Sequence, residues 1–453
     1  MLKRSAYTLL FPSFNDTAVV YHSASGRLCL LNQHAHTLAR RLLWRPNFPY
    51  TAAGYLTLRD EFVEKGFLVD SHRDELAQTR AGYARARADR SLFSLTLAPT
   101  RDCNLACIYC YEGRQAPVTW SPEDEDAVLA FAARRLPAGA GLWVTWYGGE
   151  PLLALPIVLR MSARLRELAK SRRSAWTCDM VTNGTRLTPE AARALAGVGC
   201  VEFQITLDGP KDVNDGLRPS LDHSSTFDTV LGNLARLDLT TTGIGIRINL
   251  MRDNAASLPD LVRALSAAGL AGRVGVSLAP VEAVSKPCHA IADRLVSAEE
   301  FADRHFAFLQ SLEAEGFSPE CVPGAIANYC GADREHSFLI DWRGDIFACW
   351  NDVGVVEKRL GNIHQPLALR ARESCQGRLG PFEHAECRRC PILPICMGGC
   401  PVFAGDAGGG RPVCLFVKHR LADYLNLEVL RHFGAASAGG PARSQLPPDP
   451  QDN

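Results

Sequence analysis

Residues 90–316 alternate between short apolar segments and amphipathic segments, and this alternation limits the fold more than any other feature of the chain. A helix candidate follows each strand candidate; the last helix begins at Ser297 with a Ser-x-x-Glu capping box. The strand candidates are SLFSLTLAPT (91–100), GLWVTWYGG (141–149), WTCDMVTNG (176–184), VEFQITLDG (201–209), GIGIRINL (243–250) and RVGVSLAPV (273–281). Such alternation predicts a parallel sheet with right-handed crossovers. Six units predict an α/β fold, a partial (β/α)6 barrel that is three-quarters of a full (β/α)8 barrel.

Two other regions flank the predicted barrel. Residues 1–90 contain a predicted hairpin that turns at 23–26, two amphipathic helices, a strand at 67–70 and a charged helix. The cysteine-rich region 317–433 is a predicted third domain. Residues 434–453 are small, polar and proline-rich, which predicts a disordered tail. The predicted domains are therefore 1–90, 91–316 and 317–433, followed by the tail.

Composition argues against several classes of protein. The formal net charge is zero and no basic face stands out, so nucleic acid is not an expected partner. The N-terminus carries two cations but only a short apolar run, which Pro12 and Asn15 interrupt. This is neither a signal peptide nor a membrane span, so we expect a cytoplasmic protein without membrane attachment.

The chain has sixteen cysteines, a number that favours metal binding or catalysis over disulfides in a cytoplasmic protein. Three of them lie in CNLACIYC (103–110), directly after the first strand candidate. This places them on a loop at the C-terminal mouth of the barrel, where barrel enzymes carry their chemistry. Structural zinc usually takes four ligands, whereas an iron–sulfur cubane with three protein ligands leaves one iron open. We therefore favour a cluster over a zinc site or a redox thiol.

The spacing C-x3-C-x2-C after the first strand of a partial barrel resembles the radical S-adenosylmethionine (SAM) superfamily. The resemblance implies that Cys103, Cys107 and Cys110 bind a [4Fe-4S] cluster whose open iron chelates SAM. In that family, reductive cleavage of SAM gives a 5′-deoxyadenosyl radical that abstracts hydrogen, and the protein positions and shields it.

The same resemblance assigns SAM contacts at the barrel rim. Tyr109 would lie beside adenine, and Gly148, Gly149 and Glu150 match the family's GGEP motif, where we expect the backbone to approach the SAM amino group. Further expected contacts lie on later strands and loops: Thr206 at the ribose, Arg218 at the SAM carboxylate, and Asn249 and Leu278 along the groove. Asp208 is either a further contact or a turn former.

The second cysteine group resembles the SPASM extension of radical SAM enzymes, which holds two auxiliary [4Fe-4S] clusters and brings the expected total to three. The resemblance assigns the outer cluster to Cys387, Cys390, Cys396 and Cys414. It assigns the cluster nearer the barrel to Cys330, Cys349 and Cys400. Some relatives carry another cysteine where this chain has Gly324, so Cys321 is either the fourth ligand or that iron is open.

The resemblance implies an enzyme that modifies a ribosomally synthesised precursor peptide (RiPP maturation) by hydrogen abstraction. The product would be a thioether, a carbon–carbon crosslink, an epimer or an oxidised side chain. Residues 1–90 resemble the winged-helix peptide-recognition domain of such enzymes, whose strand edge can pair with a leader peptide; the alternative is a structural cap. A flavodoxin or ferredoxin would supply electrons.

Two alternatives remain. One is an anaerobic sulfatase maturase, although Trp350 follows Cys349 where those enzymes carry an aspartate base. The other is a non-enzymatic electron-transfer protein with several clusters.

Overall fold

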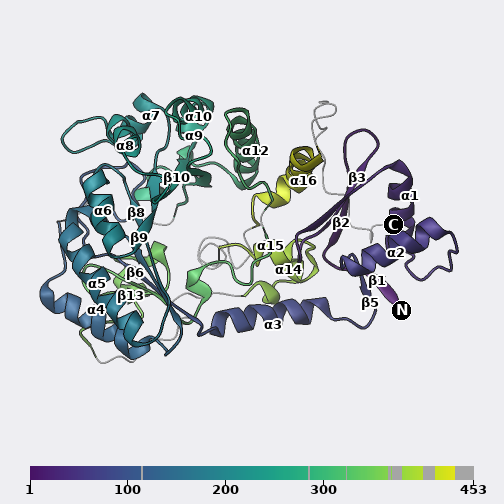
Figure 1. The fold of residues 1–453 in the computed structure, drawn as a ribbon, viewed down its shortest axis with the longest axis horizontal. Coiled ribbons are helices and arrows are strands. Elements are labelled where there is room, and N and C mark those ends of the chain that lie inside the picture. Colours follow the sequence, from purple (N-terminus) through teal and green to yellow (C-terminus); the bar gives the residue numbers. More distant parts are fainter. Residues whose placement is uncertain are drawn as a thin grey trace. The chain divides into compact units, whose positions relative to one another are not determined.

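The computed structural model describes residues 1–113, 116–283, 286–322, 324–365, 369, 380–400 and 414–433. These residues form two compact units (Figure 1). Unit 1 contains the described residues of Met1–Arg87, Glu320–Cys330 and Gly377–Asn453, and unit 2 contains those of Ala88–Pro319 and Gly331–Gln376. The predicted tail at 434–453 lies outside the described residues.

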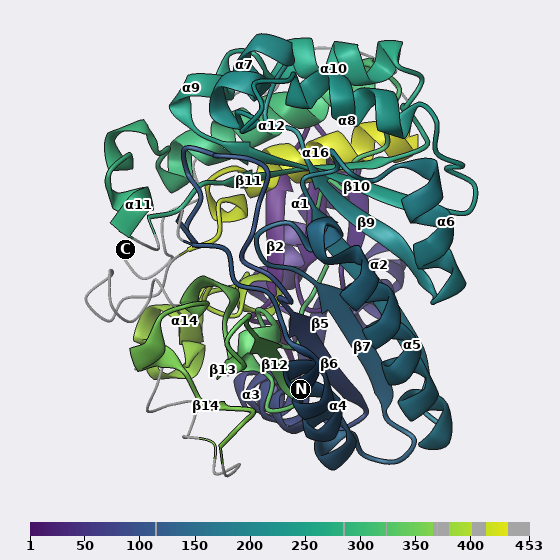
Figure 2. The same cartoon turned by 90° about the vertical axis from the view of Figure 1, so that its left-hand side faces the viewer.

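Unit 2 is built on a nine-stranded sheet with the order β11-β10-β9-β8-β7-β6-β12-β13-β14. Its first six members are parallel neighbours, which confirms all six predicted strands and the partial barrel (Figure 2). They are β6 (Leu92–Leu97), β7 (Gly141–Trp146), β8 (Trp176–Thr182), β9 (Cys200–Thr206), β10 (Gly243–Leu250) and β11 (Gly275–Pro280).

Three strands from the cysteine-rich region extend this sheet beyond β6. They are β12 (Ser337–Ile340), β13 (Asp345–Phe347) and β14 (Gly361–Asn362). β12 pairs with β6 in parallel, and the other two follow in antiparallel order. The predicted domain 317–433 is therefore divided between the two units, because the hydrogen-bonding edge of β6 takes up β12.

Helices connect successive strands of unit 2, and the last of them begins at the predicted cap, Ser297. Ser121 caps α4 in a capping box with Asp124, Thr188 caps α6, and Ser297 caps α12 in a box with Glu300. The helices are α4 (Pro122–Arg135), α5 (Leu155–Ser171), α6 (Pro189–Gly197), α7 (Lys211–Leu217), α8 (Thr226–Leu234), α9 (Arg252–Ala255), α10 (Leu258–Ala267), α11 (Lys286–His289) and α12 (Ala298–Ala314). The 3-10 turns are η1 (Pro151–Ala154), η2 (Ala292–Arg294), η3 (Gly331–Asp333), η4 (Trp350–Asp352) and η5 (Val356–Lys358).

The inner face of the barrel is polar at its rim. Along β10, Ile244, Ile246, Ile248 and Leu250 are buried, whereas the alternate residues, which include Arg247 and Asn249, are only half-buried. Successive side chains of a strand point to opposite faces. The apolar set therefore packs under the helices, and the polar set faces the barrel interior.

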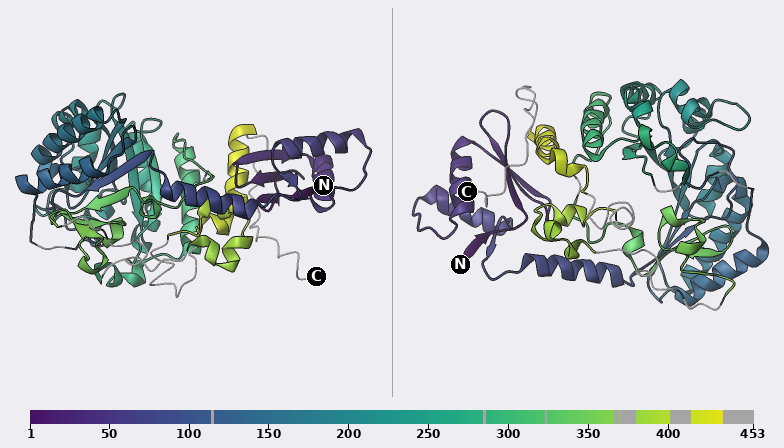
Figure 3. Two further views of the ribbon diagram at one scale, coloured as in Figure 1. Left: turned by 90° about the horizontal axis from the view of Figure 1, so that it is seen from below. Right: turned by 180° about the vertical axis from the view of Figure 1, so that it is seen from behind.

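Unit 1 contains the predicted hairpin, helices and strand, together with two strands that the sequence did not predict, β1 and β2. A three-stranded antiparallel sheet has the order β2-β3-β4, and β1 pairs with β5 (Figure 3). The strands are β1 (Leu2–Arg4), β2 (Thr8–Pro12), β3 (Ala18–His22), β4 (Arg27–Leu31) and β5 (Leu68–Asp70). The helices and the 3-10 turn are α1 (Gln33–Trp44), α2 (Ala53–Glu64), α3 (Glu75–Ala88), η6 (Pro381–Glu383), α14 (Ala385–Arg389), α15 (Leu393–Cys396) and α16 (Val417–Phe433).

The N-terminal region and the cysteine-rich region share one core inside unit 1. Tyr7 and Tyr83 are buried in the same cluster as Phe382, Leu393 and Met397. Hydrogen bonds reinforce this core: the Ser23 hydroxyl donates to the Pro391 carbonyl at 2.5 Å, and the Ser13 hydroxyl donates to Asn426 at 2.7 Å. Residues 1–87 are therefore packed with the cysteine-rich region rather than standing alone. No helix in the described parts of the chain is both long enough and apolar enough to cross a membrane.

Candidate active site

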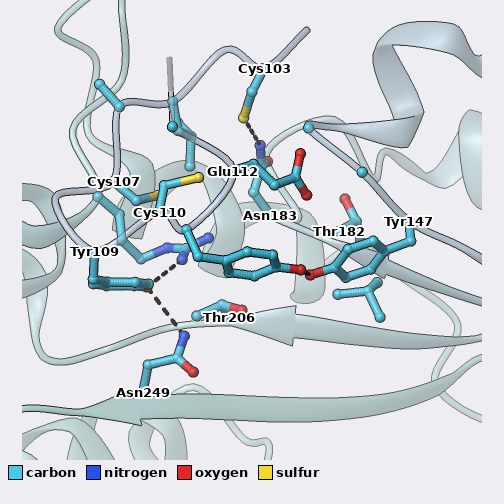
Figure 4. Close-up of a pocket in the computed structure, with 18 of the residues that line it drawn as sticks. Cys103, Cys107, Tyr109, Cys110, Glu112, Tyr147, Thr182, Asn183, Thr206 and Asn249 are labelled. Atoms are coloured by element: carbon cyan, nitrogen blue, oxygen red, sulfur yellow. Dashed lines mark hydrogen bonds between the residues drawn. The ribbon is translucent and has the colours of Figure 1, made fainter. Parts of the chain in front are cut away.

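A cavity of about 470 Å³ lies in unit 2 at the carboxyl ends of the parallel strands. Cys103, Cys107 and Cys110 line it, and Figure 4 shows their side chains above Thr206 and Asn249. The structure therefore brings the three predicted cluster ligands to the mouth of the barrel, as the sequence predicts.

The cysteine loop is fixed by the elements around it. Its backbone N–H groups at Ala106 and Ile108 donate to the carbonyls of Pro219 and Leu217, at 2.9 and 3.1 Å. On the other side, the Asn183 amide at the end of β8 donates to the Asn104 side chain at 2.9 Å and lies 3.9 Å from the Cys103 sulfur. The end of α7 and the end of β8 thus hold the loop from two sides.

The three thiols suit a cluster that binds them as thiolates. Burial raises the pKa of Cys103 to about 12 and that of Cys110 to about 11, and it also raises the pKa of Cys107. Metal binding requires the deprotonated sulfur, so a positive iron centre would supply the charge that the protein surroundings do not. Among the described residues, no group of three or more Cys, His, Asp or Glu side chains is arranged to hold a single metal ion. Three half-buried cysteines that line one cavity suit the three protein ligands of a [4Fe-4S] cluster.

Gly148 and Gly149 are required by packing against the base of the cysteine loop. A Cβ on Gly148 would meet the Thr100 carbonyl, and one on Gly149 would overlap the carbonyl oxygens of Arg101 and Asp102. Gly148 also has φ = +101°, which favours glycine. Contacts within the chain therefore exclude side chains at Gly148 and Gly149, whether or not SAM also approaches the backbone at these positions.

Glu150 is a buried structural residue. Its carboxylate accepts hydrogen bonds from Leu152 N at 2.9 Å, the Thr182 hydroxyl at 2.7 Å and Asn183 N at 2.8 Å. It thereby joins the end of β7 to the end of β8. A carboxylate with three donors is satisfied without a ligand.

Tyr109, Asp208, Arg218 and Asn249 form one hydrogen-bonded cluster at the cavity wall. The Tyr109 hydroxyl donates to Asp208 and accepts from Arg218 Nη1 at 2.6 Å and from the Asn249 amide at 3.2 Å (Figure 4). Asp208 also accepts from Asn249 N at 2.7 Å and faces Arg218 at 3.8 Å. Burial raises the pKa of Asp208, and the Arg218 charge opposes that rise. Asp208 is thus a positioning residue for Tyr109.

Thr206 lines the cavity from the end of β9, but Leu278 does not line it. Leu278 is buried and pairs in register with Ile248, whose side chain is fully buried. The prediction for Leu278 is therefore wrong, because the alternation of β11 turns this side chain toward the apolar layer. Pro280 and Val281 line the cavity in its place.

Sequence reasoning missed several residues of the cavity. An aromatic wall consists of Tyr111, Tyr147 and Trp350: the two tyrosine hydroxyls are hydrogen-bonded, and the Tyr147 and Trp350 rings lie 4.6 Å apart. The Trp350 indole donates to Thr96 at 3.0 Å. Only the position of Tyr111 beside Cys110 could have indicated this wall, because the other two rings arrive from distant segments.

Unit 1 gathers the four cysteines of the predicted outer set. Burial raises the pKa of Cys387 to about 11 and that of Cys396 to about 12, and in both cases Cys390 and Cys414 add to the rise as nearby thiolates. Lys418 on α16 donates to the Cys414 sulfur at 3.4 Å. The four sulfurs are therefore mutual neighbours, with one ammonium group among them.

The predicted inner set comes from both units. Cys330 and Cys400 belong to unit 1, and Cys349 directly precedes η4 in unit 2. Cys321, also in unit 1, is buried, and Arg431 Nη1 donates to its sulfur at 3.3 Å. The Cys321 sulfur therefore faces the guanidinium group of Arg431.

A comparison with protein families matches residues 97–265 to the radical SAM superfamily. This match covers the cysteine loop and most of the rim described above. The chain contains a radical SAM domain. Its family and its cysteine-rich region, which fits a SPASM-type extension, were both predicted from the sequence.

Curated relatives and solved structures resemble this radical SAM enzyme over most of its length. The serine-type anaerobic sulfatase-maturating enzyme of Klebsiella aerogenes is 26% identical over 68% of this chain and 79% of the relative. The mycofactocin maturase MftC of Mycolicibacterium smegmatis is 28% identical over 71% of this chain and 82% of the relative. SuiB of Streptococcus suis, solved with the precursor peptide SuiA, has a TM-score of 0.51 at 15% identity, covering 89% of this chain and 96% of SuiB. At that identity the structural likeness shows a shared fold.

Proposed function

We propose that this enzyme modifies a ribosomally synthesised precursor peptide by hydrogen abstraction in the cavity of unit 2. The observation that carries the proposal is the presence of three cluster thiols, the Tyr109 cluster and an aromatic wall around one cavity. Two similar proteins support a peptide substrate: SuiB, which was solved with its precursor peptide SuiA, and MftC, which is named as a mycofactocin maturase.

Cys103, Cys107 and Cys110 would hold the [4Fe-4S] cluster, and the Tyr109 cluster would orient SAM beside it. Together, the cluster and SAM supply a 5′-deoxyadenosyl radical when they are bound and reduced. The protein contributes position and exclusion of water: the cysteine loop is fixed at both sides, and Tyr111, Tyr147 and Trp350 close one wall.

The cysteine-rich region would hold the auxiliary clusters. Cys387, Cys390, Cys396 and Cys414 are proposed for one, and Cys330, Cys349 and Cys400, with Cys321 as fourth ligand, for the other. The interaction of Lys418 with Cys414 supports the first assignment, and that of Arg431 with Cys321 supports the second. A flavodoxin or ferredoxin in the cytoplasm is the proposed electron donor.

A leader peptide would pair with β4 of the three-stranded sheet. β4 is an edge strand, and its middle residues Leu28, Cys29 and Leu30 are only half-buried. An exposed edge of this kind can accept an added strand. Hydrogen exchange should show slower exchange at β4 when the precursor is added but not when a leaderless peptide is added. Protection confined to other strands would contradict the role of this edge.

The similarity to a sulfatase-maturating enzyme favours one second candidate, the formation of formylglycine. Trp350 opposes it, because this residue follows Cys349 and stacks on Tyr147 with no group that takes up a proton. Residue 350, the position after Cys349 where those enzymes carry an aspartate base, is therefore not a carboxylate in this chain.

Anaerobic incubation with SAM, a reductant and the short precursor peptides encoded beside this chain's gene tests the proposal. We expect 5′-deoxyadenosine together with a mass change in the precursor. A sulfatase-derived Ser or Cys peptide serves as the matched comparison. If the sulfatase peptide alone is modified, the second candidate replaces the first.

A further inference from the structure

Arg101, Asp102, Glu112, Arg247 and Glu282 are charged residues of the cavity outside the cluster and SAM assignments, and two of them, Arg247 and Glu282, lie on or just after the last two strands of the barrel. Arg247 lies on the inner face of β10, where its Cα pairs with Thr206 on β9 and with Ser277 on β11. Glu282 lies two residues after the end of β11. Both residues line the cavity, so one cation and one carboxyl group face the same enclosed space.

The Arg247 side chain is oriented but has unused donors. Its Nε donates to the Asn249 side chain at 3.0 Å, which fixes the plane of the guanidinium group. Within the described ranges this is the side chain's sole hydrogen bond, so neither Nη atom has a protein partner there. A planar guanidinium with two free nitrogens matches the two oxygens of a carboxylate.

Glu282 does not fill that position. In the described part of the chain it forms no ion pair with Arg247, whose side chain donates to Asn249 instead. Glu282 is exposed while it lines the cavity, so its carboxyl group is accessible to a ligand. The two side chains therefore line one cavity without pairing with each other, so both are available to a ligand.

We propose that Arg247 and Glu282 bind the substrate peptide, with Arg247 taking a peptide carboxylate through its Nη atoms and Glu282 accepting a peptide N–H. The inference rests on the proposed function, because it assumes a peptide in the cavity. A carboxylate at the peptide C-terminus or on an acidic side chain has the required chemistry. The pair would then place the residue to be modified relative to the Tyr109 cluster, to which Arg247 is joined through Asn249.

The carboxylate of SAM is the other group that Arg247 could bind in the same way. Arg218, the residue expected at that carboxylate, is bonded to Tyr109 and faces Asp208. Binding of a probe in the presence of SAM distinguishes the two ligands. If Arg247 binds the peptide, it stays available when SAM is bound; if Arg247 binds SAM, it does not.

Calorimetry on the anaerobic, cluster-loaded enzyme tests the proposal with two probes, N-acetyldiglycine and its amide, each with and without saturating SAM. The wild-type enzyme should bind the carboxylate form roughly ten- to a hundredfold more tightly than the amide, the range expected for hydrogen bonds to a charged group. Arg247→Met should remove this preference, and Arg247→Lys should retain part of it. Arg236→Met, a change at an exposed arginine outside the cavity, should leave the preference intact. Glu282→Leu should lower the affinity for both probes by the same factor.

Three results would overturn the inference. They are equal binding of both probes by the wild-type enzyme, an undiminished preference in Arg247→Met, and loss of carboxylate binding when SAM is saturating. Iron content and melting temperature show whether Arg247→Met is folded, and Arg247→Lys gives the answer if it is not. Because the probes need not react, this binding is measured independently of whether any precursor peptide is modified.

Discussion

Replacing Gly149 with alanine tests whether packing or SAM binding demands a glycine at this rim position. The new Cβ would overlap the carbonyl oxygens of Arg101 and Asp102, which belong to the backbone and have no flexible end to move. Gly149 N donates to the Thr100 carbonyl at 3.1 Å, and Glu150 N donates to the Asp102 carbonyl at 2.8 Å. Relieving the overlap therefore shifts the segment that leads into Cys103.

The expected cost combines overpacking with weakened hydrogen bonds. Overpacking in a tight site costs about 1–3 kcal/mol, and each weakened backbone bond costs about 1 kcal/mol. With both bonds weakened, a total of roughly 3–5 kcal/mol corresponds to a fall of roughly 6–20 °C in melting temperature for a unit of this size. Gly216 is the matched control, since it lies exposed in α7 with nothing near its Cβ position. Gly216→Ala should be neutral or stabilise by about 0.5–1 kcal/mol.

The assay is anaerobic thermal unfolding with and without SAM, together with 5′-deoxyadenosine formation. If packing is the cause, Gly149→Ala melts earlier in both conditions and loses iron from the cluster loop. If approach to SAM is the cause, the variant melts like the wild type without SAM and loses only SAM affinity. A variant with wild-type melting and wild-type iron content would refute the packing argument.

Three further predictions concern the clusters and a buried acid. Replacing Cys103, Cys107 and Cys110 together with alanine should abolish 5′-deoxyadenosine while part of the iron remains; retained cleavage of SAM would remove these residues from the assignment. Lys418→Met should lower the reduction potential of one auxiliary cluster, because a cation bonded to Cys414 stabilises the added electron, and Lys418→Arg should not; an unchanged midpoint in an EPR-monitored titration would contradict this. Burial raises the pKa of Asp341 to about 6, so its ionised form destabilises the folded state as pH rises through that value. Between pH 4 and 7 the Asp341→Asn variant should therefore become increasingly more stable than the wild type, by at most about 3 kcal/mol in the free energy of unfolding, and its melting temperature should rise accordingly. If the difference in melting temperature between the two proteins does not change with pH, Asp341 is not the titrating group.

The six strand–helix units of the barrel could be predicted because their signals are local. Ser121, Thr188 and Ser297 cap their helices as the sequence indicates, and the strands carry the apolar residues that pack under those helices. The cysteine loop follows from the same order, since a loop after a parallel strand must lie at the carboxyl end of the sheet.

Residue roles at the rim were harder to predict because they depend on partners from other strands. Glu150 matches a motif, yet its three donors come from η1 and the end of β8, so its role is to join two strands. Arg247 and Glu282 lie in no motif at all, and only the closure of the barrel brings them to one cavity.

The sequence by itself determined the parallel barrel, the three-cysteine loop and the family, because periodicity, caps and short spacings are properties of neighbouring residues. Only the tertiary structure decided that β12 extends the barrel sheet beside β6 and that Tyr7 and Tyr83 share a core with the cysteine-rich region. Strand pairing and core packing join segments roughly 240 to 390 residues apart, and nothing in the local pattern of either partner specifies which distant edge or apolar face it will meet.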